Sequence, residues 1–120
     1  MNWFATGAVA AGIGVALGAF GAHGLRGRIS PDVMAIFETG VRFHMYHALA
    51  LLAVGWAASR SSGHAVQVAG WSFVAGIVVF SGSLYLLAVT GARGFGAITP
   101  VGGIAFLAGW TALALAALRP

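Results

Sequence analysis

The side chains best suited to chemistry in this sequence are its histidines. His44 and His47 are three positions apart, which places them on one face of a helix. His23 follows a stretch rich in Gly and Ala. If the segment between His23 and His44 lies on one side of the structure, all three imidazoles reach a similar depth. They could then ligate a metal or a haem, or relay protons. Alternatively, they hydrogen-bond to loop carbonyls and, in a membrane, to lipid head groups.

Hydroxyl groups form two further clusters. Ser81 and Tyr85 share a helical face, with Ser83 between them. A serine nucleophile here would need a histidine as its base, and the order Ser-Gly-Ser lacks the Gly-x-Ser-x-Gly elbow of hydrolases. Thr99 suits a helix N-cap, beside which backbone amides could hold an anion. We expect no catalytic residue and no metal site. The candidates for a ligand or proton pocket are His23, His44, His47, Ser81, Ser83, Tyr85 and Thr99.

The composition decides what kind of structure must position these residues. Of the 120 residues, 60% are hydrophobic and only 7% are charged, whereas a soluble domain carries about 25% charged residues. An ordinary cytosolic enzyme and a disordered chain are therefore excluded. The net charge of +4 comes from arginines scattered at the ends of apolar runs, which is typical of membrane helices and not of a nucleic-acid surface. The absence of Cys excludes disulfides and thiolate chemistry.

Four apolar runs are long enough to be membrane helices. A helix rises about 1.5 Å per residue, so about 20 residues cross the apolar core of a bilayer. The runs are about 3–23, 43–59, 65–89 and 98–118. Together they predict a single membrane domain over residues 1–120.

The polar segment 24–42 lies between the first two runs. Ser30 and Pro31 have the pattern of a helix start, and apolar residues then recur every four positions. Glu38 is spaced to pair with Arg42. We therefore expect a short amphipathic helix at the membrane interface, or an extension of the second span, with Gly40 as a point of interruption.

Small residues repeat at intervals of three and four along the first and fourth runs. Such faces let helices approach closely, which is how helices associate inside a membrane. They pack helices within one chain, or they form the interface of a homo-oligomer. The glycines expected to pack helices are Gly7, Gly14, Gly18, Gly21, Gly102 and Gly109.

The arginines predict the orientation. Four spans place both termini on one side of the membrane, and the two sides then carry unequal positive charge. One side has Arg26, Arg28, Arg42 and Arg93, and the other has Arg60 and Arg119. The positive-inside rule favours loops 24–42 and 90–97 in the cytoplasm and both termini outside. We expect a multi-pass protein of the bacterial inner (plasma) membrane.

Several segments carry a family resemblance. They are Gly18–Leu25 (GAFGAHGL), Phe43–Leu49 (FHMYHAL), Phe80–Tyr85 (FSGSLY) and Ile98–Gly103 (ITPVGG), with Gly109 and Trp110. In this order they resemble the domain of unknown function 423 family, small membrane proteins that include the bacterial YgdD and animal transmembrane protein 256 groups. The family often has Gln where His44 stands, which weakens a metal role for His44. The resemblance implies a four-helix membrane protein without an assigned activity. The resemblance also implies which residues match the family pattern: His23, His47, Ser81, Ser83, Tyr85, Thr99 and Pro100.

These observations predict an all-α fold: a membrane bundle of four transmembrane helices, with a short amphipathic interfacial helix between the first and second. The favoured function is non-enzymatic, a structural or accessory component that packs with itself or with a larger membrane complex and needs no cofactor. One alternative is a transporter-like or small-ligand-binding protein with a His/Ser/Tyr pocket. Another is haem or metal binding through His23 and His47. The expected partners are the lipid bilayer and a homo-oligomer or larger complex, and not nucleic acid.

Overall fold

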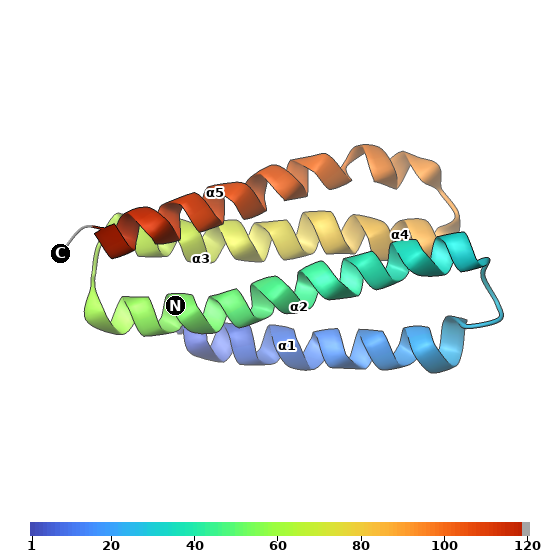
Figure 1. The fold of residues 1–120 in the computed structure, drawn as a ribbon, viewed down its shortest axis with the longest axis horizontal. Helices are drawn as coiled ribbons and strands as arrows, with labels where there is room; N and C mark the ends of the chain where they lie inside the picture. The colour runs from blue at the N-terminus through green and yellow to red at the C-terminus, as the bar shows by residue number, and fades with distance from the viewer. Residues whose placement is uncertain (119–120) are drawn as a thin grey trace.

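Four helical rods run side by side in the computed structural model, which describes residues 1–118 (Figure 1). The first rod is α1 (Trp3–Phe20), extended by a π-helical turn (Gly21–Leu25), and the second is α2 (Pro31–Arg60). The third joins α3 (His64–Gly76), a π-helical turn (Ile77–Ser81) and α4 (Gly82–Thr90). The fourth is α5 (Thr99–Leu118), which follows a 3-10 turn (Arg93–Ala97).

Three of these rods have the length and composition of membrane spans: Trp3–Leu25, His64–Thr90 and Arg93–Leu118. They agree closely with the predicted runs 3–23, 65–89 and 98–118. The predicted run 43–59 belongs to α2, which is not among the three candidates within residues 1–118. Polar and charged side chains at both ends and in the middle of α2 lower its hydropathy. The chain is therefore a helical membrane protein with three spans identified from composition.

The predicted separate interfacial helix between the first two spans is wrong, because residues 31–60 form one continuous helix, and the alternative of an extension of the second run is confirmed. The helix starts where the sequence indicated, and the Ser30 Oγ accepts a hydrogen bond from the Val33 N–H at 3.2 Å. Gly40 does not interrupt it. A Cβ at Gly40 would lie 2.9 Å from the Tyr85 ring, so this glycine gives an aromatic side chain of α4 room to pack.

The apolar face at the start of α2 packs on α1 rather than on lipid. Phe37 is only 1% exposed, and a Cβ at Gly21 would lie 2.6 Å from its ring. Met34 lies beside it in the same buried cluster. The repeat of apolar residues is therefore the continuation of a helix–helix contact, and not the surface of a separate helix.

Glycines bring α1 against α2 along most of its length. A Cβ at Gly7 would lie 2.8 Å from the Ala48 carbonyl oxygen. Two helical turns further along α1, Gly14 faces the flexible side chain of Met45. Gly18 is less tightly packed, since a Cβ there would meet Val41 at an ordinary 3.5 Å.

Glycines also bring α5 against α3, but here the opposite partners are aromatic. A Cβ at Gly102 would lie 2.6 Å from the Phe80 Cα, and one at Gly109 would lie 2.6 Å from the Phe73 ring. The exchange is reciprocal, because the ring of Phe106 on α5 packs on Gly76 of α3. Both glycine faces predicted from the sequence therefore pack helices within this chain.

The rods form a flat molecule of 51 × 26 × 18 Å. In Figure 1, α2 and the α3–α4 rod lie in the middle, with α1 and α5 on the two outer sides. The start of α1, the loop 61–63 and the end of α5 lie at one end of the bundle, here called the Arg60 end. The connections from α1 to α2 and from α4 to α5 lie at the other end.

Two wide helical turns mark the first and third rods. The Gly82 N–H donates to the Ile77 carbonyl, five residues back, and the Arg26 N–H donates to the Gly21 carbonyl in the same way at 3.1 Å. Such a turn holds one residue more than an α-helical turn. The turn in the third rod ends at Ser81, and Ser83 and Tyr85 follow in α4.

Candidate functional site

His44 lies in the middle of the bundle, between α1 and α4. Its Nε2–H donates to the Ala10 carbonyl oxygen at 2.7 Å, since a carbonyl oxygen can only accept. Its Nδ1 lies 2.9 Å from the Tyr85 hydroxyl oxygen, so these two atoms share a second hydrogen bond. The imidazole is 4% exposed. One side chain of α2 therefore joins α1 and α4.

His47, one helical turn further, faces α5. The indole N–H of Trp110 donates to its Nε2 at 3.0 Å, which leaves the proton on Nδ1 to donate to the Phe43 carbonyl at 2.6 Å. The imidazole also stacks on the Phe106 ring, with 3.5 Å between ring centroids. Both ring nitrogens are engaged, so a metal or haem iron would have to displace one of these bonds.

His23 lies apart from the other two histidines. It is exposed in the π-helical turn that ends the first rod. His44 instead bonds Ala10, which lies in the first rod 13 positions before His23 (23 − 10). At about 1.5 Å per residue this separates the two by about 20 Å. The expectation that all three lie at one depth is wrong, because α2 begins at Pro31 and carries His44 deep into the bundle. Across residues 1–118, no group of three His, Asp or Glu side chains is arranged to hold a metal ion.

The serines of the third rod bond to backbone or hydroxyl groups, not to a base. Ser81 is fully buried and donates to the Gly40 carbonyl at 2.7 Å. Ser83 bonds the Phe80 carbonyl at 2.8 Å, and its oxygen lies 2.6 Å from the Thr99 hydroxyl.

The predicted N-cap role of Thr99 is also wrong. Thr99 is itself the first residue of α5, and its hydroxyl bonds to Ser83 and to the Phe95 carbonyl at 3.3 Å. Because the hydroxyl is directed into the bundle, it joins α4 to α5. The anion site expected beside it has no support from this geometry.

The predicted pocket residues therefore do not line one shared pocket. They form separate ties between helices: His44 with Tyr85, His47 with Trp110, Ser81 with Gly40, and Ser83 with Thr99. In the part of the chain that the structure describes, every buried side-chain nitrogen and oxygen has a hydrogen-bond partner. Such ties hold helices together where water cannot satisfy polar groups.

Sequence reasoning missed three side chains that make ties of this kind, Trp3, Gln67 and Trp110. The Trp3 indole N–H donates to the Gln67 side-chain oxygen at 3.2 Å, which joins α1 to α3. Gln67 was visible as a polar residue inside an apolar run. Trp110 carried a signal too, because an indole N–H inside an apolar run needs an acceptor. Neither signal names the partner, which depends on how the helices are placed side by side.

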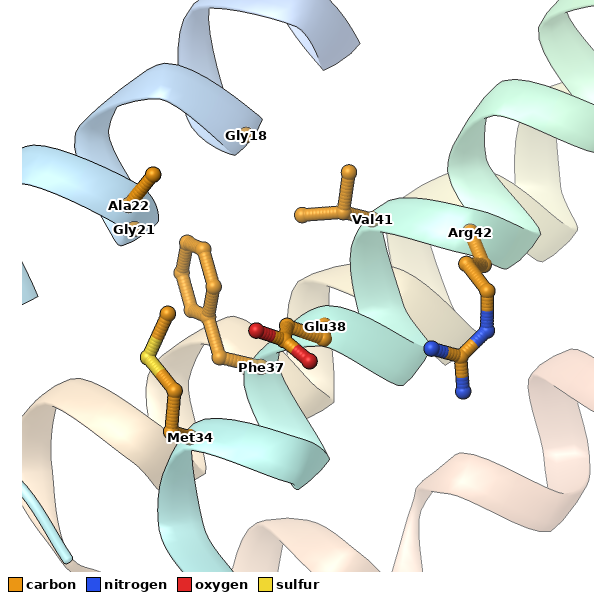
Figure 2. Close-up of a pocket in the computed structure, with 8 residues that line it drawn as sticks. All are labelled: Gly18, Gly21, Ala22, Met34, Phe37, Glu38, Val41 and Arg42. Atoms are coloured by element: carbon orange, nitrogen blue, oxygen red, sulfur yellow. The ribbon is translucent and has the colours of Figure 1, made fainter. Parts of the chain in front are cut away.

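A cleft of about 270 Å³ lies between the end of the first rod and the start of α2 (Figure 2). Gly18 and Gly21 form one wall, and the ring of Phe37 points toward them. The predicted pair of Glu38 with Arg42 is wrong, because Glu38 lies 3.7 Å from Arg26 across the cleft's end. Arg42 instead donates to the Thr39 hydroxyl at 3.2 Å. Exposed ion pairs of this kind stabilise little.

A second hollow is a groove of about 480 Å³ between α1 and the α3–α4 rod. Its walls are apolar, with Ile13 on one side and Ile77 on the other. The hydrogen-bonded pair of His44 and Tyr85 is part of its lining.

Comparison with known proteins gives the family. The profile of the family described as "Protein of unknown function (DUF423)" matches residues 17–103. The UPF0382 membrane protein YwdK of Bacillus subtilis is 51% identical over 114 residues, covering 94% of this chain and 93% of the relative. The UPF0382 membrane protein SERP0230 of Staphylococcus epidermidis is 49% identical over 113 residues, covering 94% and 92%.

The match is equally broad in a third relative. The UPF0382 membrane protein SH2409 of Staphylococcus haemolyticus is 45% identical over 113 residues, covering 94% of this chain and 92% of the relative. No solved structure matches the chain. The family model matches more than half of the chain and these relatives cover 94% of it, and the chain accordingly belongs to the DUF423 family of UPF0382 membrane proteins.

Proposed function

We propose that the protein is a non-enzymatic structural or accessory component of the bacterial plasma membrane. In this proposal it crosses the membrane four times and packs with itself or with a larger membrane complex. The observation that carries the proposal is the complete pairing of its buried polar side chains within residues 1–118. Apart from the exposed His23, the candidates for proton transfer or catalysis already join two helices, so these polar groups serve the packing of the bundle.

The crossing of α2 follows from chain direction. The first rod starts at the Arg60 end and finishes at the other end, and α3 starts again at the Arg60 end, where Trp3 bonds Gln67 at 3.2 Å. The chain between them must return across the same thickness, and α2 is the segment that does so. Its 30 residues are long enough. The arginines near the opposite end favour that end in the cytoplasm and both termini outside.

The shape of the molecule supports assembly with other chains. The bundle is 18 Å along its shortest axis, close to the thickness of two packed helices. The outer rods α1 and α5 each pack mainly on one neighbour and present large apolar side chains outward, such as Val9 and Leu107, which are 64% and 68% exposed. Lipid or a protein surface must cover these faces.

The test is site-specific photo-crosslinking in native membranes. A photoreactive residue at Val9 or at Leu107 should give a discrete adduct at the mass of two chains, or with one defined membrane protein. The same residue at Ala69, which is 0% exposed, is the matched control and should give no adduct between chains. Exclusive recovery of single chains from both outer positions would contradict the proposal.

The groove beside His44 and Tyr85 favours a second candidate, a small-ligand-binding protein. In that case the groove holds an apolar ligand or water, and its polar pair is reachable. Because the chain has no Cys, single cysteines at Ser81 and Tyr85 can be tested with a water-soluble thiol reagent, with Ser62→Cys in the exposed loop as the positive control. Inert cysteines at both positions favour the structural component, and labelling at Tyr85 favours the ligand-binding candidate.

A further inference from the structure

Two hollows at the Arg60 end have no role in the proposed function. Two adjoining hollows, of about 680 and 380 Å³, share Ser61, Ser62, Val66 and Ala116 in their walls. They lie between the end of α2, the start of α3 and the end of α5. Both are in the size range of sites that hold a small organic ligand. We call them together the Arg60 cleft.

The Arg60 cleft is apolar on one side and polar on the other. Ala53, Ala57 and Leu113 line its deeper part, toward the middle of the rods. Arg60, Ser61, Ser62 and His64 line its outer part, at the loop that ends the rods. The change from apolar to polar therefore runs along the length of the bundle, in the same direction as the change from acyl chain to head group in a bilayer.

The charge at this end is positive. The acidic side chains of the whole sequence are Asp32 and Glu38, and both lie in the first turns of α2, at the opposite end. Arg60 is held over the face of Trp56, with its guanidinium carbon 5.1 Å from the ring centroid. This cation–π contact restrains the guanidinium at the mouth of the cleft. A phosphate group is the partner that matches a guanidinium flanked by hydroxyl groups.

We propose that the Arg60 cleft binds one anionic phospholipid. Its phosphate contacts Arg60 and the hydroxyls of Ser61 and Ser62, and one acyl chain lies in the apolar part beside Ala53 and Leu113. A neutral lipid fills the apolar part equally well but gains less from the arginine. The site takes a single molecule because the cleft is bounded by three helices.

Native mass spectrometry of the full chain in mild detergent tests the proposal. The probes are dioleoyl phosphatidylglycerol, dioleoyl phosphatidylcholine and inorganic phosphate. The wild-type protein should retain one phosphatidylglycerol in preference to phosphatidylcholine. Arg60→Gln should lower phosphatidylglycerol retention about fivefold, the effect of one arginine near an anionic lipid. Arg28→Gln, at the opposite end, is the matched control and should leave retention unchanged.

A second variant tests the apolar part without changing charge. Ala53 is exposed in the wall of the cleft, so Ala53→Phe should fill the acyl-chain position and lower retention of both lipids. Ala8→Phe, at an exposed position on α1, should not. Equal retention by wild type and Arg60→Gln would overturn the proposal, as would equal losses in Arg60→Gln and Arg28→Gln. Inorganic phosphate that displaces phosphatidylglycerol at equal concentration would identify a simple anion site instead.

Discussion

The two outer rods are attached by the same device, a glycine face, but what stands opposite differs. Against α5, the glycines face the backbone of Phe80 and the ring of Phe73. In the first rod, Gly7 faces the Ala48 carbonyl and Gly21 faces the Phe37 ring, but Gly14 faces the thioether of Met45. An aromatic side chain has few rotamers and a helix backbone cannot change conformation without breaking the helix. A Met side chain can move into another rotamer. The contact of α5 with the third rod is therefore rigid at Gly102 and Gly109, and the α1–α2 contact is adaptable at Gly14.

The two buried histidines repeat this difference with hydrogen bonds. His47 is locked by Trp110, by the Phe43 carbonyl and by a stacked ring of Phe106. His44 bonds a backbone carbonyl of α1 and the hydroxyl of Tyr85. Substitution at Gly102 should therefore cost more than substitution at Gly14, and substitution at His47 more than at His44. The four predictions below compare these two pairs.

The largest effect is expected for Gly102→Ala. A Cβ there would lie 2.6 Å from the Phe80 Cα, so two helix backbones must separate. We expect a loss of about 3 kcal/mol in the free energy of unfolding, measured by titration with sodium dodecyl sulfate in mixed micelles. Gly12→Ala, where nothing lies within 4 Å, is the control and should lose nothing. Equal stability of both variants would refute the rigid contact.

His47→Phe should be the next most damaging change. The ring can still stack on Phe106, but the Trp110 indole N–H loses its acceptor inside the bundle. Although Trp110 is 44% exposed, its surroundings in a membrane offer no water, and an indole N–H without an acceptor there should cost about 2 kcal/mol. The double variant with Trp110→Phe removes donor and acceptor together, so its loss should be smaller than the sum of the two single losses. A double-mutant cycle in the same micelles measures this coupling, and strict additivity would argue against the bond.

His44→Phe should cost less, about 1 kcal/mol. The Ala10 carbonyl lies inside α1 and can keep its helical hydrogen bond, and the Tyr85 hydroxyl borders the groove. The unfolding free energy of this variant, measured beside that of His47→Phe, gives the difference between the two sides directly. If His44→Phe proves the more damaging of the two, the comparison between the two outer rods is reversed.

Gly14→Ala should have the smallest effect, about 0.5 kcal/mol, because the Met45 side chain can turn away. Met45→Phe in the same background replaces the adaptable partner with a rigid one. The combined variant should then lose clearly more than the two single changes together. An additive result would mean that the surroundings of Gly14 relax by some other movement, and that the flexibility of Met45 is not the cause.

Much of the fold was predictable because apolar runs set the bounds of three rods. The start of α2 was also predictable, since Ser30 and Pro31 carry a local signal that does not depend on tertiary contacts. After that start the sequence left two courses open, a separate helix or an extension of the second run. Whether Gly40 bends a helix or admits a neighbour depends on Tyr85, which is 45 positions away (85 − 40).

The candidate residues could be predicted by type but not by partner. A polar side chain inside a span must find a hydrogen-bond partner, and this rule singles out His44, His47 and Ser81 from the sequence. Their partners on other helices depend on the relative shift of the rods, which no local pattern encodes. For the same reason Glu38 was assigned to Arg42 on its own helix, although Arg26 from the preceding turn is the residue it contacts.

Because of the wide turn at Ile77–Ser81, the hydrogen bonds of Ser81, Ser83 and Tyr85 depend on the number of residues in that turn. One extra residue in a turn rotates all that follows by about 100° around the helix axis. Deleting one residue, such as Val78, would leave a regular helix of the same polarity and turn Ser81, Ser83 and Tyr85 away from their partners. Related chains can therefore substitute residues in this turn freely. A related chain that lacks one residue of the turn should also lack the hydroxyl cluster.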